Sequence, residues 1–151
     1  RDSAVKGHDF AIELAKHLRS EFSELTLTLT GRTQAEPSWI RGLGWVAEDE
    51  KLRLLQNSSI LLVPSEYEGQ PMVVLEALAC GLPVCVSDRL VDVPEGVKVA
   101  TYGDIEHWGR VISELLTSPP DEGKLLESSQ PYRIESISNE WKRVYESAIV
   151  R

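Results

Sequence analysis

Two glutamates, Glu68 and Glu76, stand eight positions apart in a segment where carboxylates could act on a ligand. Between them, Gly69 would let the backbone approach that ligand closely. A helix is predicted to begin just after Gln70, and the free amide groups and positive dipole end of a helix favour an anion. A carboxylate further along the helix could accept hydrogen bonds from hydroxyl groups such as those of a ribose. The segment therefore suits a ligand with a diphosphate between two sugars.

A plainer interpretation accounts for the same acids. Glu66 and Glu68 would be solvated residues of a loop, and Glu76 would face solvent on its helix. On spacing alone this interpretation is somewhat favoured, because glutamates are mostly exposed. The predicted helices and strands around these glutamates, and the residues next to them in the sequence, help to decide between the two interpretations.

Hydrophobic patterning predicts the elements that position this segment. Strands are expected at 25–29, within 39–46, at 60–63, at 83–86 and at 97–100. Helices are expected at 9–22, 48–56, 71–80 and 104–116, with closing helices near 122–127 and 138–149. This alternation predicts an α/β domain, Rossmann-like and three-layered, with a mainly parallel sheet. Ligands of such sheets bind beyond the carboxyl ends of the strands, which points to the loops after Leu29, Val63 and Val86.

The same patterning assigns caps and buried faces to the helices. Asp9 and Asp104 are expected to cap the first and fourth helices. Inward-facing positions are predicted at Leu52 and Leu55 on the second helix and at Met72, Leu75 and either Leu78 or Ala79 on the third. On the last helix, one side is expected to carry Trp141, Val144, Tyr145 and Ala148.

Charge and composition exclude several classes of protein. The 151 residues carry a net charge of −8, whereas a nucleic-acid partner usually requires a basic face, so any anion site must be local. Cys80 and Cys85 form no CxxC pattern, so no disulfide partner is expected and a reducing, cytoplasmic setting is favoured. No apolar run approaches the roughly 20 residues of a membrane helix. The 3 histidines have no metal-ligand spacing.

The segment Pro64–Asp88 reads PSEYEGQPMVVLEALACGLPVCVSD. It holds, in order, a Pro-Ser pair, Glu-Gly at 68–69, the E-x7-E pair of Glu68 and Glu76, E-A-x-A-x-G-x-P-V at 76–84, and a closing Ser-Asp. This order resembles the signature of family 4 glycosyltransferases, which are retaining enzymes of the two-domain GT-B type. The resemblance implies that the chain is the C-terminal, nucleotide-sugar-binding domain of such an enzyme.

Two further matches extend the resemblance over nearly the whole chain. Arg1, followed after four residues by Lys6 and Gly7, is similar to the family's diphosphate-binding pair. The residues around Leu43, Gly44 and Trp45 are similar to the segment that, in this family, lies against the nucleotide base. The same resemblance implies that no cofactor and no metal are needed, and no D-x-D motif is found here.

The family pattern implies a role for each matching residue. Glu76 would bind the ribose hydroxyls, and Glu68 would lie beside the donor sugar where transfer happens, as the catalytic positioning group. Gly69, Gln70 and Pro71 would line the donor phosphates, with Gly69 and Gln70 contributing backbone N–H groups. Arg1 and Lys6 would neutralise the leaving diphosphate. Gln70 departs from the family, which often has an aromatic residue at this position.

The resemblance also implies what lies outside residues 1–151. The N-terminal acceptor-binding domain and the first strand of the sheet are expected to be absent, so this fragment by itself is expected to be inactive. The implied partners are a nucleotide sugar such as a UDP-, GDP- or ADP-sugar and, through the missing domain, an acceptor glycan or glycolipid. A cytoplasmic enzyme of polysaccharide synthesis is expected, with peripheral association at the inner membrane face through that domain.

Two other functions stay open at the level of sequence. A nucleotide-sugar epimerase of the same architecture would bind a similar ligand without needing an acceptor. A non-catalytic nucleotide-sugar-binding module would keep the fold, and the complete protein would transfer no sugar. A dehydrogenase is disfavoured, because no G-x-G-x-x-G follows a predicted strand.

Overall fold

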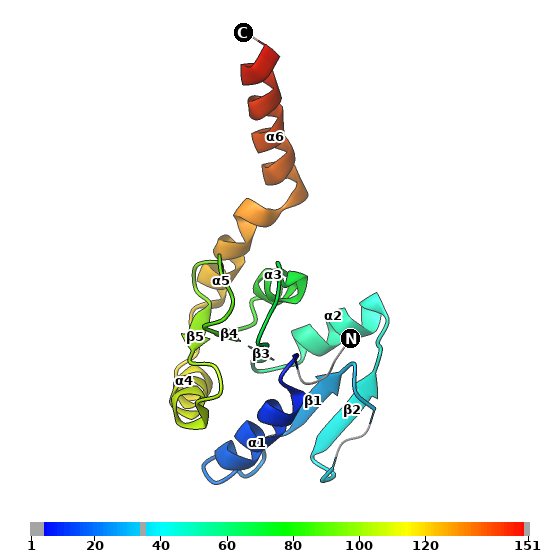
Figure 1. Ribbon diagram of the computed structural model, residues 1–151, viewed down its shortest axis with the longest axis vertical. Helices are drawn as coiled ribbons and strands as arrows, with labels where there is room; N and C mark the ends of the chain where they lie inside the picture. Colours follow the sequence, from blue (N-terminus) through cyan, green and yellow to red (C-terminus); the bar gives the residue numbers. More distant parts are fainter. Residues whose placement is uncertain (1–4, 34–35, 150–151) are drawn as a thin grey trace.

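The computed structural model describes residues 5–33 and 36–149 (Figure 1). The strands of these ranges are β1 (Leu27–Thr30), β2 (Ile40–Gly44), β3 (Leu61–Val63), β4 (Val84–Ser87) and β5 (Lys98–Ala100). The helices are α1 (His8–Leu18), α2 (Glu48–Gln56), α3 (Met72–Ala79), α4 (Ile105–Thr117), α5 (Glu122–Ser129), the 3-10 turn η1 (Gln130–Tyr132) and α6 (Ile134–Ile149). The α/β class predicted from the alternation is confirmed.

All strand pairs of the described residues are parallel, as predicted. They form two sheets where one was expected: β1 pairs with β2, and β3, β4 and β5 form a three-stranded sheet with β4 in the centre. The registers place Leu62 opposite Cys85 and Val86 opposite Val99. The carboxyl ends of β3, β4 and β5 therefore meet at one edge, where a parallel sheet presents its ligands.

Strand β4 shows that helices cover both faces of the three-stranded sheet. Its four residues are all buried. Val84 and Val86 pack in a cluster with side chains of α3 and α5, whereas Cys85 packs in a second cluster with α1 and α4, which includes the fully buried Trp108. Because neighbouring side chains of a strand point to opposite faces, this division describes three layers. The predicted three-layer arrangement is confirmed.

Helix α1 begins differently from the prediction. Gly7, with φ 71°, occupies the N-cap position, and Asp9 lies inside the first turn, where its carboxylate pairs with Arg32. The helix ends at Leu18 instead of near Phe22, because the chain turns there to enter β1. Asp104 does cap α4, since its carboxylate accepts a hydrogen bond from the His107 N–H at 2.9 Å.

The buried faces of two helices agree only in part with the predicted ones. In α2, Leu55 is buried and Leu52 is exposed. In α3, Met72 is 58% exposed, and the buried positions are Val74, Ala77 and Leu78. Leu55 and Leu78 were therefore predicted correctly, whereas Leu52 and Met72 were not. Val74 and Ala77 were missed because α3 packs against both the sheet and α5, which one sequence pattern does not indicate.

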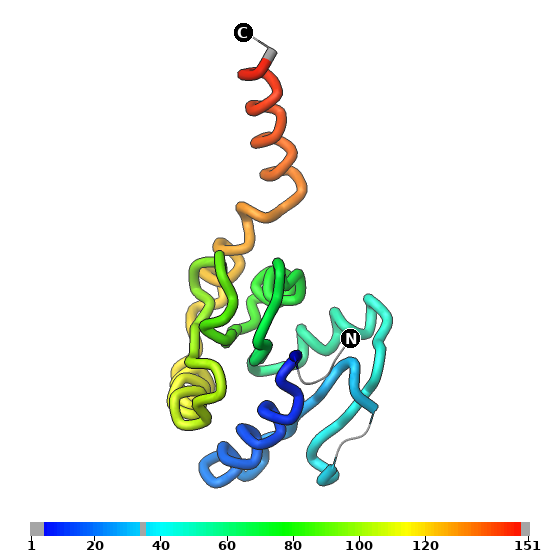
Figure 2. The backbone as a smooth tube through the Cα atoms, viewed as in Figure 1, coloured from blue at the N-terminus to red at the C-terminus, as the bar shows by residue number. Residues whose placement is uncertain are grey.

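Helix α6 leaves the rest of the domain and extends away from it (Figure 2). It begins at Ile134, after η1, and not near Ser138 as predicted. Trp141, Val144 and Tyr145 lie on one side, as expected, but each is exposed. None of the helices in the described ranges is long and apolar enough to cross a membrane.

Candidate functional site

Two loops that are far apart in the sequence lie against each other at the start of α1. The Glu66 N–H donates a hydrogen bond to the Val5 carbonyl oxygen at 2.9 Å. Gly7 is buried against Pro64, and a Cβ added there would lie 2.4 Å from the Pro64 carbonyl oxygen. Together with its positive φ, this close approach requires glycine. The Lys-Gly pair and the Pro-Ser pair found in the sequence are therefore neighbours in the fold.

The contact brings the predicted phosphate-binding lysine to the predicted catalytic glutamate. Lys6 Nζ forms an ion pair with Glu68 Oε1 across 62 residues of sequence. The hydroxyl of Ser65 donates a hydrogen bond to the same oxygen at 3.1 Å. The Glu68 side chain is 17% exposed, so it is not the solvated acid of the plainer interpretation, which fits only the exposed Glu66. Arg1, the other predicted cation, lies outside the described residues.

The N-terminal end of α3 adjoins this pair. The helix begins at Met72, one residue later than predicted, so that Pro71 is its N-cap residue and not its first helical residue. No side chain of the described residues caps the first N–H groups of the helix. Gly69 and Gln70 are exposed, and a Cβ at Gly69 would meet no atom within 4 Å. The Val74 N–H donates to the Pro71 carbonyl at 2.9 Å, so the N–H groups of the chain before Val74 are the ones to which an anion could bind here.

Glu76 is held from one side only. Lys51, on α2, donates a hydrogen bond from Nζ to Glu76 Oε1 at 2.9 Å and also contacts Glu48 Oε2 at 2.7 Å. The second oxygen of Glu76, Oε2, is buried and has no hydrogen-bond partner among the residues that the structure describes. A buried acceptor without a partner costs about 1–3 kcal/mol, which a hydroxyl donor would recover.

Lys51 was missed by reasoning from the sequence. It stands in the run Glu48-Asp49-Glu50-Lys51 at the start of the helix predicted at 48–56, for which no role in the site was predicted. The pKa of Lys51 is raised, first by its hydrogen bond to Glu48 and then by that to Glu76. A single cation after three acids was the available signal, although it does not name Glu76 as the partner.

The predicted base neighbourhood lies where β2 ends. The Gly31 N–H donates to the Gly44 carbonyl at 2.6 Å, and the Gly44 N–H donates to the Arg32 carbonyl at 2.9 Å, which joins the exits of β1 and β2. Leu43 is half-buried in β2, whereas Trp45 is 89% exposed. The chain then enters α2, the helix that carries Lys51. The exposed indole of Trp45 thus precedes, in the sequence, the helix whose Lys51 contacts Glu76.

His8 adds to the electrostatics of the Lys6 side. The pKa of His8 is lowered, chiefly by burial and then by the charge of Arg32, with a smaller lowering from Lys6. Its Nδ1 is buried without a hydrogen-bond partner in the described part of the chain. The two cations that lower this pKa, Arg32 and Lys6, are themselves paired with Asp9 and Glu68.

Other parts of the described surface offer less. Hollows of about 320 Å³ between α1 and α4 and about 370 Å³ beside α6 contain none of the predicted site residues. Within residues 5–33 and 36–149, no three His, Cys, Asp or Glu side chains gather as ligands for a metal. The cluster around Lys6, Glu68, the start of α3 and Glu76 is accordingly the candidate site.

Comparison with known proteins identifies the family of the chain. The sequence profile of the family described as Glycosyl transferases group 1 matches residues 1–118. An uncharacterized glycosyltransferase of Haemophilus influenzae is 25% identical over 164 residues, which cover 93% of this chain and 46% of that protein. The MMP alpha-(1->4)-mannosyltransferase of Mycolicibacterium hassiacum is 29% identical over 118 residues, or 70% of this chain and 28% of that protein. The chain spans less than half the length of these relatives.

Solved structures share the fold at low identity. The pneumococcal O-GlcNAc transferase GtfA, determined in complex with UDP and GlcNAc, matches with a TM-score of 0.73 at 18% identity over 97% of this chain and 34% of that one. The GtfA/B complex matches with a TM-score of 0.76 at 16% identity over 95% and 33% of the two chains. These likenesses confirm the fold predicted from the sequence.

Proposed function

Because the chain belongs to the group 1 glycosyl transferases, we propose that it binds the nucleotide-diphosphate sugar from which the complete enzyme transfers a sugar to an acceptor. The observation that carries this proposal is the meeting of Lys6 with Glu68 beside the start of α3. A cation, uncapped helix amides and a supported carboxylate come together there from two distant segments.

In this proposal Lys6 binds the diphosphate. When the donor binds, its ammonium group exchanges part of its contact with Glu68 for the phosphate oxygens, and the N–H groups of Gly69, Gln70 and the first turn of α3 complete the site. Arg1 adds a second cation. These groups stabilise the charge that develops on the diphosphate as the bond from sugar to phosphate breaks, without a metal ion.

Glu76 and the residues at the carboxyl end of β2 bind the nucleoside in this proposal. The buried, unpartnered Oε2 of Glu76 accepts hydrogen bonds from the ribose hydroxyls. The base then lies toward Leu43, Gly44 and the exposed Trp45. Two structural relatives support a nucleotide ligand, since GtfA was determined with UDP and GlcNAc and Anabaena HepE, with a TM-score of 0.55, was determined with UDP.

Glu68 positions the transferred sugar in this proposal. Held by Ser65, it lies beside Lys6 and fixes the sugar relative to the diphosphate, in a reaction that retains the anomeric configuration. The acceptor, a glycan or glycolipid, is bound by parts of the protein beyond this chain. We place the reaction in the cytoplasm, with peripheral association at the inner face of the membrane.

Thermal stabilisation by nucleotides tests the proposal. A ligand that binds only the native state raises the melting temperature, with about 2.7 kcal/mol of stabilisation at a hundred times its dissociation constant. We expect one of UDP, GDP and ADP to stabilise the protein, and Glu76→Ala and Lys6→Ala each to remove most of that effect. The nucleotide that stabilises names the base.

Lys98→Ala is the matched control, because Lys98 also pairs with a glutamate, Glu114, but on another part of the surface. This variant should keep the full nucleotide effect. If none of the three nucleotides stabilises the parent protein, donor binding by this chain is wrong. If a nucleotide binds but the full-length protein isomerises the nucleotide sugar without an acceptor, the epimerase alternative replaces the transferase.

A further inference from the structure

The contact between α2 and α3 gives Glu76 an asymmetric environment. Its Oε1 is held by Lys51 at 2.9 Å, and its Oε2 is buried with no hydrogen-bond partner within residues 5–33 and 36–149. The two residues are separated by 25 positions and lie on different helices. Nothing in the E-x7-E motif specifies this neighbour, so the packing of α2 against α3 supplies it.

We propose that Lys51 is a positioning residue for nucleoside recognition: it fixes the Glu76 carboxylate so that Oε2 is presented to the ribose hydroxyls. This inference rests on the proposed function and adds a residue to it. Lys51 does not touch the donor and acts only through Glu76.

Rotation of the carboxylate is the motion that Lys51 restricts. The terminal torsion of glutamate is broad and roughly two-fold, so an unrestrained carboxylate samples many orientations. The Glu76 side chain is 32% exposed, and an unheld carboxylate could turn toward water and away from the buried position of Oε2. An ammonium group has three donors, which lets Lys51 hold Oε1 of Glu76 while it also contacts Glu48.

Lys51 is suited to orientation more than to stability. Its side chain is 27% exposed, and ion pairs this accessible contribute little to folding. Its pKa is raised by the two glutamates, so the ammonium form persists through the neutral range and the support does not vary there. The effect of losing Lys51 should therefore appear in ligand recognition.

The test compares affinities for a nucleotide with and without its ribose hydroxyls. UDP, GDP and ADP are screened by calorimetry with the full-length protein, and the one that binds is compared with its 2′,3′-dideoxy form. A hydrogen bond to a charged group corresponds to roughly tenfold or more in affinity, so loss of the hydroxyls should weaken binding to the parent protein by at least that factor. In Lys51→Met the same loss should cost about threefold or less, because Oε2 is no longer presented.

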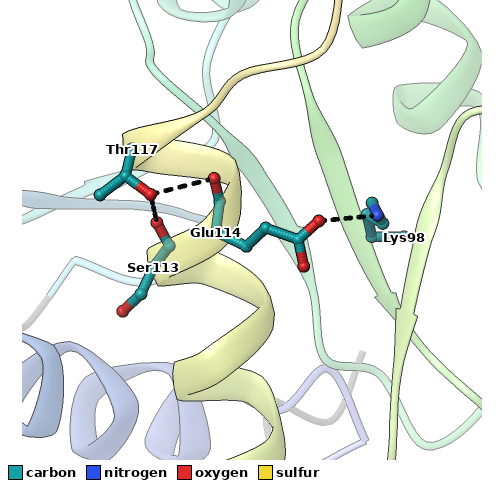
Figure 3. A network of polar contacts seen from close by, with 4 residues as sticks. All are labelled: Lys98, Ser113, Glu114 and Thr117. Carbon is teal, nitrogen blue, oxygen red and sulfur yellow. Dashed lines mark hydrogen bonds and ion pairs between the residues drawn. The ribbon is translucent and has the colours of Figure 1, made fainter.

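Two variants serve as controls. Lys98→Met removes a lysine from a comparable ion pair, in which Lys98 Nζ lies 3.2 Å from Glu114 Oε1 (Figure 3), and it should keep the full dependence on the hydroxyls. Lys51→Arg keeps a cation beside Glu76 and should restore most of that dependence. Melting temperatures measured alongside identify any variant that fails to fold.

Each outcome separates the inference from the function on which it rests. If Lys51→Met retains the parent's full dependence on the hydroxyls, or weakens both nucleotide forms equally, the positioning role is wrong and donor binding stands. If the parent binds a nucleotide but does not distinguish the dideoxy form, the role is likewise wrong. If none of the three nucleotides binds, both the proposed function and this inference fail.

Discussion

The two glutamates of the E-x7-E pair each form an ion pair with a lysine. The two ion pairs differ in whether the group expected to bind the donor is already engaged. In the Lys6–Glu68 pair, the lysine is the group expected to meet the phosphates, and Glu68 already occupies it. In the Lys51–Glu76 pair, the lysine takes Oε1 and leaves Oε2 without a partner. Under the proposed function the first pair has to open for the donor, whereas the second is already arranged to receive it.

The difference also lies in the elements that build the pairs. Lys6 and Glu68 stand on loops, and their meeting depends on the close contact of Gly7 with Pro64. Lys51 and Glu76 stand on two packed helices, whose positions are fixed by buried residues such as Leu55, Val74 and Leu78. Charge removal should therefore act in opposite directions at the two sites, and backbone strain should damage only the first.

The largest effect is expected from Gly7→Ala. The new Cβ would lie 2.4 Å from the Pro64 carbonyl oxygen at a residue with φ 71°, so clash and strain add. We expect the free energy of unfolding to fall by roughly 2–4 kcal/mol and the melting temperature to fall on the order of 10 °C. Thermal and urea unfolding measure both quantities.

Gly103→Ala is the matched control for this substitution. Gly103 has φ 76°, but a Cβ there would meet no atom within 4 Å, so only the conformational cost of about 1 kcal/mol applies. Equal losses in the two variants would contradict the close fit of Gly7 against Pro64. Nucleotide binding should be lost together with Lys6 placement in Gly7→Ala and kept in Gly103→Ala.

A smaller effect of opposite sign is expected from Glu68→Gln. The substitution removes a negative charge beside the phosphate site and frees Lys6, so affinity for the bare nucleoside diphosphate should rise by about three- to tenfold. Glu76→Gln should lower the same affinity. Calorimetry at fixed ionic strength measures both changes, and a decrease in both variants would mean that the Lys6–Glu68 pair does not compete with the ligand.

The smallest effect concerns His8, which lies beside Lys6. Its pKa is lowered from 6.5 in the folded protein by burial and by Arg32, so the unfolded chain takes up the proton first as pH falls. Stability should therefore decline below about pH 6.5, and His8→Asn should reduce that decline. Melting temperatures at pH 7.5 and 5.5 measure the difference between the two proteins.

Nuclear magnetic resonance titration of His8 sharpens the same comparison. A bound diphosphate would offset the positive charges around His8 and raise its pKa toward 6.5, and Lys6→Ala should diminish the rise. An unchanged His8 pKa on saturation with nucleotide would place the phosphates away from the Lys6 side.

Local sequence signals predicted much of this molecule because they depend on neighbouring residues. Helix α2 spans 48–56 as predicted, and the Asp104 cap is present, since charge pattern and capping act within a few residues. Asp9 was assigned as a cap wrongly, because Gly7 takes the N-cap position under a constraint from Pro64. On α3, Leu78 was predicted correctly and Met72 was not, because α5, far along the chain, also packs on this helix.

The order of motifs in the sequence by itself determined the family. It also led to the prediction that Lys6, Glu68 and Glu76 are site residues. The tertiary structure alone decided how they are paired: Lys6 with Glu68 across 62 residues, and Glu76 with Lys51 across 25. Composition and spacing fix which chemical groups are present and how nearby residues fold. Which residues become partners through packed helices and touching loops depends on the whole fold. The fold sets the distance between a carboxylate and each nearby cation, and ion pairs form only over a few ångströms.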